Sequence, residues 1–392
     1  MFGSFSLSAL AFVFALAAGA VWAAGIRLSD TTDVLLERFG LGQALGGLIL
    51  LAVVTNLPET AITASASLSG ELGIAVGNIL GGIAIQTAVL VLVDVFGVRG
   101  ERSLSYRAAS LSLVLEGTLV IIVLAVTVMS SQLPSSLIFG RVTPGGLLIL
   151  VCWVVGIVLL YKAQVRLPWS EEREPPGSQR VPKGTARARK DRDARNKGIS
   201  TTQTLVAFAV ATVITLIAGV ALEQSGEIIA GRIGMNGILF GSTVLAAATA
   251  LPEISTGLAS AKLGDYQLAV SDIFGGNAFL PVLFFLAGLL SGQAVFPELR
   301  DTDMYLIGLG VLLTSVYIYG LIFRPRRTVL RMGLDSLVVL ALYLLGTAGL
   351  ALVGQGWMAA ETVWCPAPFL ILDSGEFPWG TSENSPSTHS AE

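Results

Sequence analysis

Two copies of one short motif place a carboxylate directly after a proline inside an apolar run. The first copy is T-N-L-P-E at residues 55–59, and the second is T-A-L-P-E at residues 249–253, which begins 194 positions later (249 − 55). A proline inside a helix removes one amide hydrogen bond and clashes with the carbonyl four residues back, so each copy should free one backbone carbonyl. Ionisable groups at membrane depth are costly and are usually functional. Glu59 and Glu253 are therefore the first candidates for chemistry.

Freed carbonyls and carboxylates together make an all-oxygen set of ligands. Such a set suits a hard cation such as calcium or sodium. Each glutamate should also begin the next half-helix, where the helix dipole stabilises its negative charge. The alternative is a proline kink in which the glutamate is bound by a neighbouring hydroxyl. Because the motif occurs twice, the sequence favours a cation site that contains Glu59 and Glu253.

The register between the two copies continues without a gap on both sides of the motif. The matched positions carry the same small or apolar residue: Gly47/Gly241, Leu51/Leu245, Ala52/Ala246, Gly70/Gly264, Ala75/Ala269, Ile79/Ile273, Gly81/Gly275 and Gly82/Gly276. A match of this length indicates an internal duplication.

A second pair of motifs follows in each copy, G-N-I-L-G-G at residues 77–82 and S-D-I-F-G-G-N at residues 271–277. Small residues four apart are the ordinary means of close helix packing in membranes. Paired glycines also let the backbone approach an ion. Both interpretations stay open for the glycines. For Asn78 and Asp272 the sequence favours a functional role, because polar groups recur at one place in both copies.

The composition predicts an all-α polytopic membrane protein. Of 392 residues, 53% are hydrophobic and only 13% are charged, whereas a soluble domain carries about a quarter charged residues. The single histidine, His389, lies near the end, which excludes a histidine-based metal site or catalytic triad in the body. Ten apolar segments have spanning length: residues 7–26, 41–68, 72–97, 105–129, 144–162, 202–222, 235–261, 266–291, 303–323 and 330–353.

These spans predict four regions and an orientation. The regions are a first five-helix half (1–162), a basic linker (163–200), a second five-helix half (201–353) and a disordered tail (354–392). All but three of the 24 Lys and Arg residues fall on one side of the membrane, the exceptions being Arg141, Arg232 and Arg300. The positive-inside rule makes the basic side cytoplasmic and puts both termini outside. The expected location is the plasma (inner) membrane of a prokaryote, with the first span retained rather than cleaved.

Matched residues of the two copies are separated by five spans. Because this number is odd, the two halves must be inverted relative to one another. Inverted repeats with a site at their interface near the membrane midplane are a transporter architecture. We therefore expect ten transmembrane helices, arranged as two inverted five-helix repeats, with Glu59 and Glu253 close together.

Residues 41–97 and 235–291 resemble the two alpha-repeats of the calcium/cation antiporter superfamily, which includes the sodium/calcium exchangers. The repeats of that family carry G-T-S-x-P-E followed by G-N-x-x-G-S-N. This chain keeps the Thr, Pro and Glu in both copies, and it keeps Gly77, Asn78 and Gly81 in the first. The resemblance implies ten spans and secondary-active cation exchange.

The same resemblance implies a set of ion ligands. The two glutamates are the expected central ligands, and the repeat threonines and the small residue seven positions before each glutamate are expected to contact the ion. With the polar residues of the second motif, the expected ion-binding set is Glu59, Glu253, Thr55, Thr249, Ala52, Ala246, Asn78, Asp272 and Asn277. The expected metal ligands among them are Glu59, Glu253, Thr55 and Thr249.

Several positions depart from the family pattern. The serine after each threonine is replaced by Asn56 and Ala250, and the serine of G-S-N is replaced by Gly82 and Gly276. Where family members often place Asn or Asp, this chain has Gln86 and Leu280. Side-chain ligands typical of sodium sites are therefore missing, and coupling to sodium or to protons stays open.

Other acidic residues in or near the spans are weaker candidates. Glu116 either lines the permeation path or pairs with a hydroxyl or basic residue of a neighbouring helix. Two acids near span ends are expected to be interfacial, and two in short turns are expected to be solvated: Asp94 and Asp335, then Glu71 and Asp265.

The function predicted from the sequence is antiport of calcium, or another divalent cation, against sodium or protons, without a cofactor. The expected partners are inorganic cations and the lipid bilayer, with no nucleic acid and no protein partner indicated. One alternative is a non-transporting membrane scaffold descended from an exchanger, which the lost hydroxyls keep open. The other is an intramembrane acid hydrolase. The chain has no hydrolase motif, and we do not expect an enzyme.

Overall fold

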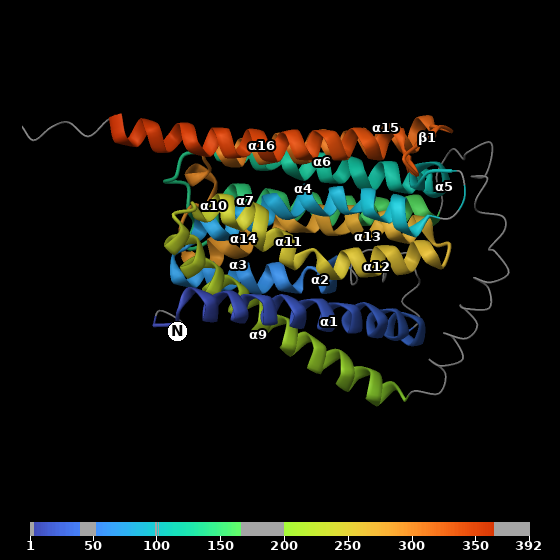
Figure 1. Cartoon of the computed structure of the whole chain (residues 1–392), viewed down its shortest axis with the longest axis horizontal. Coiled ribbons are helices and arrows are strands. Elements are labelled where there is room, and N and C mark those ends of the chain that lie inside the picture. Colours follow the sequence, from blue (N-terminus) through green and yellow to red (C-terminus); the bar gives the residue numbers. More distant parts are fainter. Residues whose placement is uncertain (1–3, 40–51, 99, 101, 166–199, 364–392) are drawn as a thin grey trace, which may run out of the picture. The chain divides into compact units, whose positions relative to one another are not determined.

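The computed structural model describes residues 4–39, 52–98, 100, 102–165 and 200–363, and most of these residues are helical (Figure 1). The contacts divide the chain into a compact unit, Met1–Gly354, and a second unit, Gln355–Glu392. The arrangement below is that of the first unit. The predicted linker (163–200) falls almost wholly outside the described residues, as do residues 364–392 of the predicted tail. Residues 354–363, which were also predicted to be disordered, instead continue α16. The linker, the rest of the tail and the boundaries of the two halves stay predictions.

The first half of the chain contributes α1 (Leu7–Phe39), α2 (Ala52–Thr55), α3 (Leu57–Ser69), α4 (Leu72–Gly97), α5 (Leu104–Ala108), α6 (Leu111–Ser131) and α7 (Pro144–Val165). The second half begins with α9 (Thr201–Ile233), α10 (Gly237–Phe240), the π-helix η2 (Gly241–Leu245), α11 (Ala246–Thr249) and α12 (Leu251–Lys262). It continues with α13 (Tyr266–Phe279), the 3-10 turn η3 (Leu280–Val282), α14 (Leu283–Ser291), the 3-10 turn η4 (Phe296–Glu298), α15 (Asp301–Phe323) and α16 (Leu334–Val363).

A short antiparallel hairpin joins α15 to α16. Its strands β1 (Thr328–Val329) and β2 (Met332–Gly333) pair Thr328 with Gly333 and Val329 with Met332. Both residues of the turn, Leu330 and Arg331, have positive φ, as a two-residue hairpin turn requires.

Eight of the described helices are long and apolar enough to cross a membrane, and the bent pair Gly237–Thr249 and Leu251–Lys262 raises the number to nine. The remaining predicted span, 41–68, lies partly outside the described residues. Only its second part, which contains α2 and α3, is described. The polytopic helical architecture is therefore confirmed, and the count of ten stays a prediction.

The two halves are inverted, and a pair of exchanged contacts makes the inversion visible. Helix α1 starts at the end marked N, whereas α9 starts at the opposite end (Figure 1). A Cβ on Gly25 of α1 would lie 2.6 Å from the Pro252 side chain of the second half. A Cβ on its matched residue, Gly219 of α9, would lie 3.0 Å from the Pro58 carbonyl oxygen of the first half. Each half thus presses one long helix against the proline break of the other.

The turn after each half-helix also repeats in detail. Gly70 ends α3 at φ 88°, and the matched Gly264 follows α12 at φ 82°. Both angles lie in the left-handed region, which glycine adopts without steric cost. The duplication seen in the sequence is therefore a duplication of local structure.

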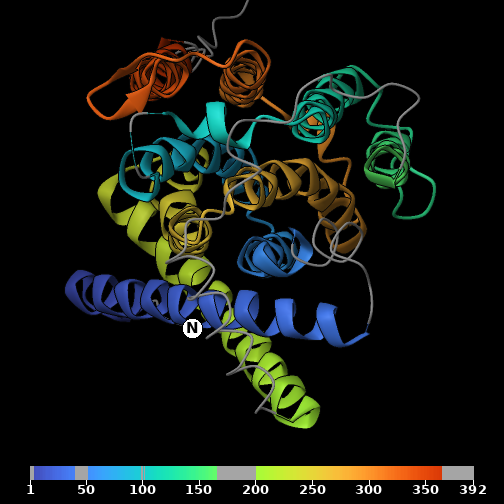
Figure 2. The same ribbon diagram turned by 90° about the vertical axis from the view of Figure 1, so that its right-hand side faces the viewer.

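The α1–α9 pair lies on one side of the helices that carry the motifs. The two helices pack against each other and cross (Figure 2). Helices α3 and α12 lie between this pair and the inner helices α4 and α13. The proline breaks are therefore enclosed by helices of both halves.

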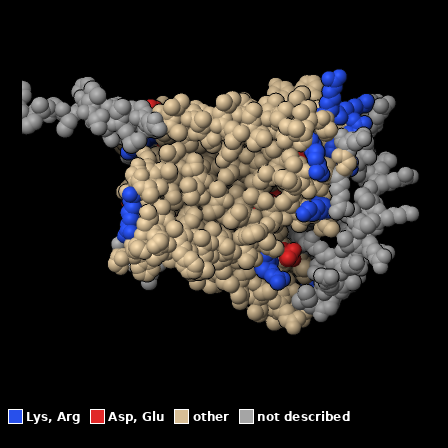
Figure 3. All heavy atoms as spheres, in the orientation of Figure 1, with Lys and Arg blue, Asp and Glu red and all other residues tan. Residues whose placement is uncertain are grey.

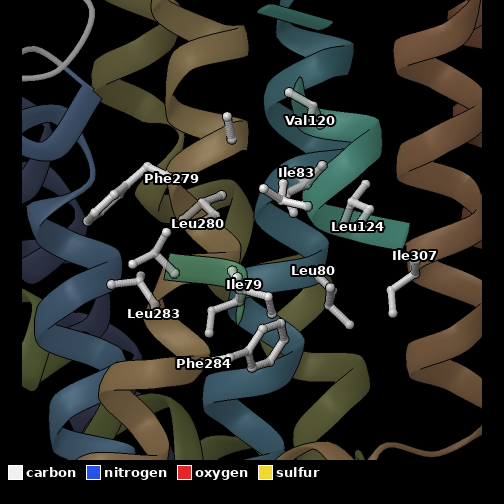
Figure 4. Packing of buried hydrophobic residues seen from close by; sticks show 14 of the residues in the cluster. Ile79, Leu80, Ile83, Val120, Leu124, Phe279, Leu280, Leu283, Phe284 and Ile307 are labelled. Atoms are coloured by element: carbon white, nitrogen blue, oxygen red, sulfur yellow. The ribbon is translucent and has the colours of Figure 1, made fainter. Parts of the chain in front are cut away.

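The largest apolar cluster lies among α4, α6, α13, α14 and α15 (Figure 4). Its buried members include Ile79, Leu80, Ile83, Val120, Leu124, Phe279, Leu280, Leu283, Phe284 and Ile307. This packing joins both halves, because α4 and α6 come from the first and the other three helices from the second. It holds α4 and α13 firmly beside the motif helices.

The glycines of α4 permit its close approach to the second half. A Cβ on Gly77 would lie 2.5 Å from the Ile238 carbonyl oxygen, and a Cβ on Gly81 would overlap the Ser242 backbone. The packing role that the sequence allowed for these small residues is thus present in the structure.

We expect Gly81→Ala to destabilise the protein by about 1–3 kcal/mol, the usual cost of overpacking a rigid contact. The added methyl group meets backbone, which cannot move aside as a side chain could. The measurement is the thermal unfolding midpoint of detergent-purified protein. The matched control is Gly308→Ala in α15, where a Cβ would meet nothing within 4 Å. Equal midpoints for the two variants would contradict the prediction.

Basic side chains gather at one end of the bundle. On the face shown in Figure 3, most Lys and Arg side chains lie at the end that carries α5 and β1. Arg102, just before α5, donates a hydrogen bond to the Arg326 carbonyl, just before β1. The membrane orientation that we inferred from the charges stays a prediction.

Candidate functional site

Both T-x-L-P-E motifs interrupt a helix, as predicted. In the first half, α2 ends at Thr55 and α3 begins at Leu57. In the second half, α11 ends at Thr249 and α12 begins at Leu251, with a bend of 42° between them. Each proline lies in the first turn of the new helix, where the N–H groups have no intrahelical partner in any case. The proline therefore begins the new helix at a position where its missing N–H group costs no intrahelical hydrogen bond.

The irregular backbone of the second half is longer than the motif alone predicts. Directly before α11, residues Gly241–Leu245 form a π-helix. Such turns are rare and are found frequently at functional sites. The matched residues of the first half, 47–51, lie outside the described part of the chain.

Glu59 and Glu253 both lie in the first turn of their half-helices and are buried. Their side chains are 0% and 2% exposed, respectively. Helix N-termini stabilise negative charge, so the two carboxylates occupy the place where each half-helix favours them. The two groups also interact electrostatically, which is the proximity that the inverted repeat predicts.

Glu59 is held by amide and hydroxyl groups from both halves. Gln86 of α4 donates through Nε2 to Glu59 Oε1 at 3.4 Å and to Asn56 Oδ1 at 3.3 Å. Thr249 of the second half also hydrogen-bonds the Glu59 carboxylate. The other oxygen, Glu59 Oε2, has no hydrogen-bond partner among the described residues. Glu59 is thus oriented on one side and open on the other.

Glu253 has a different environment. Neither of its carboxylate oxygens has a hydrogen-bond partner in the described part of the protein. The charged groups that act on it are the carboxylates of Glu59 and Asp272. A buried carboxylate that no other described residue hydrogen-bonds, facing two other acids, is unfavourable unless positive charge is supplied.

Asp272 lies on α13 and is 8% exposed. It accepts a hydrogen bond at 3.0 Å from the Thr256 hydroxyl of α12, one turn after Glu253. Its carboxylate therefore both contacts a neighbouring helix and contributes to the charge around Glu253. The two roles considered for it from the sequence coexist in the structure.

The threonines and small residues of the predicted set line the same region. Thr55, Thr249, Ala52 and Ala246 are all buried. The Ala52 carbonyl accepts a hydrogen bond from Asn56 Nδ2 at 2.7 Å. The Ala246 carbonyl accepts one from the Thr249 hydroxyl at 3.2 Å. These carbonyls are thus held by polar side chains of their own motif, and the Ala246 carbonyl also accepts a hydrogen bond from the Ala250 N–H at 3.0 Å.

Two predicted residues are buried without a described contact to either glutamate. Asn78 is 0% exposed, and neither its amide nitrogen nor its amide oxygen has a partner among the described residues. Asn277 donates through Nδ2 to the Thr87 hydroxyl of α4 at 2.9 Å. Asn78 and Asn277 therefore lie in the helix packing around the site and not against the glutamates.

Three residues that surround the carboxylates were missed as ligands by sequence reasoning. Asn56 and Gln86 were treated only as replaced family positions, yet both form the network around Glu59. Thr256 contacts Asp272, and its position three residues after Glu253, on the same helix face, was the available signal. A Cβ on Gly276 would lie 2.8 Å from Asn56 Nδ2, so the lost serine makes room for the asparagine.

The other acids separate into three groups. Glu71 is exposed and Asp265 is partly exposed, in the turns that precede α4 and α13, as expected. Glu116 is buried and bonds the Ser271 hydroxyl of α13, the second of the two roles considered for it.

Asp94 and Asp335 lie near helix ends and are buried there by neighbouring elements, at 1% and 7% exposure, and their interfacial depth stays a prediction. Asp94 accepts hydrogen bonds from two backbone N–H groups and the Ser336 hydroxyl, which tie the start of α16 to α4.

Within the described residues, no group of three or more His, Cys, Asp or Glu side chains has the geometry of a metal site. The centre consists instead of two glutamates, Asp272 at longer range, and neutral oxygens of hydroxyls, amides and carbonyls. Such a mixed oxygen set suits a hard cation that binds and leaves rather than one held permanently.

Solved structures of cation exchangers have the same fold. The sodium-calcium exchanger NCX_Mj superposes with a TM-score of 0.55 at 17% identity, covering 88% of this chain and 99% of that one. The H+/Ca2+ exchanger CAX superposes with a TM-score of 0.59 at 12% identity, covering 90% and 88%.

Two bacterial proteins are similar in sequence. The inner membrane protein YrbG of Escherichia coli (strain K12) is 25% identical over 326 residues, which cover 75% of this chain and 90% of YrbG. The putative antiporter CaxA of Alkalimonas amylolytica is 25% identical over 281 residues, covering 72% of this chain and 79% of CaxA.

A family model described as sodium/calcium exchanger protein matches residues 9–166 and 203–351. The two matched segments correspond to the two inverted halves and together span most of the chain. The chain therefore belongs to the sodium/calcium exchanger family, whose members are transporters and not enzymes.

Proposed function

We propose that this protein is a secondary-active antiporter that exchanges calcium, or another divalent cation, for protons or sodium at a site between Glu59 and Glu253. Its family supports cation antiport in general. The choice of ion and the residues that bind it are argued here from the charges and contacts of the site.

The observation that carries the proposal is the uncompensated charge at Glu253. Its carboxylate is buried, both of its oxygens lack a hydrogen-bond partner among the described residues, and the charges acting on it are acidic. Leaving ions unpaired in a poorly solvated interior costs several kcal/mol each. A structural role would provide hydrogen bonds instead. A bound cation, or a proton when the cation leaves, would neutralise the charge of Glu253, for which the described residues provide no positive partner.

The donor set favours a divalent cation. The carboxylates of Glu59 and Glu253 neutralise two positive charges, and Thr55 and Thr249 can add hydroxyl oxygens. Hard oxygen ligands of this kind, with two carboxylates, match calcium. The Gln86 amide, which also donates to Asn56 Oδ1, hydrogen-bonds one oxygen of Glu59 and so orients it.

Alternating access would follow from the inverted halves. Helices α1 and α9 each press a glycine against the proline break of the opposite half. Inverted repeats support two mirror-related states, one open to each side of the membrane. Movement of one half against the other would expose the same pair of glutamates to either side.

The proposed location is the inner membrane of a bacterium, where the similar protein YrbG is named as residing. The proposed orientation has the basic linker in the cytoplasm and both termini outside, on the positive-inside rule.

The test is uptake of radioactive calcium into proteoliposomes made with the purified chain, under an imposed proton gradient and then an imposed sodium gradient. We expect calcium to accumulate against its own gradient with one of the two. Vesicles carrying a Glu59→Gln/Glu253→Gln double variant provide the matched control. No uptake under either gradient, from a folded parent protein, would favour the non-transporting scaffold.

A further inference from the structure

The hairpin between α15 and α16 carries positive charge that the rest of the described chain leaves unpaired. Its exposed basic residues are Arg326 and Arg327, just before β1, and Arg331 in the turn. None of their guanidinium groups makes a hydrogen bond or ion pair with a described residue. The hairpin joins two apolar spans, Asp301–Phe323 and Leu334–Val353. It therefore lies where these helices leave the bilayer, at the level of the lipid headgroups.

The tip of the hairpin is apolar as well as basic. Val329 is 43% exposed and Leu330 is 75% exposed, and arginines lie on both sides of them. The hairpin projects outward from the helices that carry it (Figure 2). Apolar side chains beside arginines are the combination that binds a membrane surface, because the apolar groups enter the acyl boundary while the cations are attracted to anionic headgroups.

The two turn residues are not those that the turn itself favours. Leu330 and Arg331 have φ angles of 52° and 67°. A two-residue turn with positive φ at both positions favours Asn-Gly, because other side chains are strained there. The leucine and the arginine make this turn less favourable than it could be, and a role in local shape alone does not explain them.

The matched loop of the first half has neither feature. Residues 326–331 correspond to Q-L-P-S-S-L at residues 132–137, which contain no basic residue. Ser135 and Ser136 occupy the positions of Val329 and Leu330. A loop between the fourth and fifth spans thus forms without a basic, apolar tip. The positive-inside rule accounts for arginines on one side of the membrane, but not for exposed apolar residues among them.

The base of the hairpin is fixed to the end of α4. The Gly333 N–H group and the Ser336 hydroxyl both donate to Asp94 Oδ2 at 2.7 Å. Met332 is buried in the apolar cluster that contains the last turns of α4. The tip is therefore exposed, whereas the base holds the helix that carries Gln86.

We propose that this hairpin binds anionic phospholipid: the guanidinium groups of Arg326, Arg327 and Arg331 contact the lipid phosphate, and Val329 and Leu330 enter the acyl boundary beside it. Arginine suits this role because its fork of N–H donors matches phosphate oxygens. The inference goes beyond the proposed exchange, since the lipid is bound and not transported. Through the base of the hairpin, bound lipid holds the end of α4, so exchange should be faster in membranes that contain anionic lipid.

Lipid titration followed by native mass spectrometry tests the site without relying on transport. The probes are phosphatidylglycerol and phosphatidylcholine with identical acyl chains, added to the delipidated full chain in detergent. Arg327→Gln/Arg331→Gln should weaken binding of the first phosphatidylglycerol molecule at least about tenfold, because each basic residue near an anionic lipid contributes about fivefold. Binding of phosphatidylcholine should not change.

The matched control is Lys162→Gln/Lys262→Gln. It also removes two exposed positive charges, from the last turns of α7 and α12, and leaves the hairpin intact. Affinity for phosphatidylglycerol should change by less than about threefold in this control, because distant exposed charges are screened.

Leu330→Asn/Arg331→Gly separates lipid binding from a structural role of the turn. It supplies the residues that the turn favours, so the thermal unfolding midpoint should stay the same or rise. It also removes one arginine and the apolar tip, so affinity for phosphatidylglycerol should fall at least about fivefold. A turn with a purely structural role would leave lipid binding unchanged.

Calcium exchange gives a functional readout, which alone rests on the proposed function. The parent should exchange faster in vesicles of phosphatidylcholine with phosphatidylglycerol than in vesicles of phosphatidylcholine alone. Arg327→Gln/Arg331→Gln should exchange at the same rate in both.

Four results would overturn the lipid site. The parent binds both lipids with equal affinity, the hairpin variant and the lysine control lose affinity equally, the Asn-Gly variant keeps its full affinity, or excess inorganic phosphate displaces the lipid and so assigns the arginines to a soluble anion. If the parent exchanges no calcium in either kind of vesicle, the proposed function fails and the lipid titrations still decide the site.

Discussion

Replacing Glu59 or Glu253 with glutamine is expected to abolish calcium exchange while leaving the protein folded. Each variant keeps the shape of the side chain and removes one of the two charges that face the ion. At an effective dielectric constant of about 20, one charge pair at contact distance is worth on the order of 4 kcal/mol. This corresponds to about a thousandfold in calcium affinity. The measurement is calcium uptake into proteoliposomes, together with calcium titration of the purified variants.

The stability of the empty protein provides a second readout of the same substitutions. Glu253 is buried without a hydrogen-bond partner among the described residues. Neutralising it should therefore leave the unfolding temperature without calcium unchanged or raise it, since an unpaired buried charge is removed. The stabilisation that calcium gives the parent should disappear.

The matched control is Asp301→Asn, which neutralises an exposed carboxylate at the start of α15. It should retain parental exchange and parental stabilisation by calcium. Exchange at the parental rate in either glutamate variant would contradict the proposal that both carboxylates bind the transported ion.

Asp272→Asn is expected to flatten the pH dependence of calcium binding and transport while calcium binding itself persists. The carboxylates of Glu59 and Asp272 both act on that of Glu253, and one divalent cation balances only two of these three charges. Protons and calcium should therefore compete, so that acidification weakens calcium binding in the parent. Removing one carboxylate should lower the number of protons displaced per calcium by about one. The variant also reproduces the first half, where Asn78 occupies the matched position.

Thr256→Val separates this effect from a structural role. It removes the hydroxyl that bonds Asp272 across the α12–α13 contact and leaves all three carboxylates in place. If Asp272 only joins the two helices, both variants should behave alike. An unchanged pH profile in Asp272→Asn, or a strict requirement for sodium in the parent protein, would count against proton coupling.

Some features of the site follow from local chemistry and were therefore predictable. Proline cannot continue a helix without losing a hydrogen bond, so the breaks at residues 56 and 250 could be inferred from Pro58 and Pro252 alone. The left-handed turns at Gly70 and Gly264 likewise follow from local chemistry, since only the backbone of one or two residues is involved. The inversion of the halves followed from counting spans between matched residues.

The surroundings of each polar side chain could not be inferred in the same way. Asn56 and Gln86 were taken as lost ligands, yet Gln86 binds Glu59 and Asn56 holds Gln86, because α4 packs against α3 and Gly276 leaves room for the asparagine. Asp94 and Asp335 lie near span ends, but the hairpin and α5 cover them. Burial of such groups depends on which elements pack over them, and spacing along one helix does not contain that information.

The sequence by itself determined the duplication, the helix breaks and the pair of glutamates, because these depend on residue type and on spacing along a single chain. The tertiary structure alone decided that Glu59 is supported by amides whereas Glu253 faces acids. It alone placed Asp94 of α4 beside the start of α16. Both outcomes arise where helices of the two halves meet, and the electrostatic energy of a buried carboxylate is determined by the groups within a few ångströms of it, whichever part of the chain supplies them.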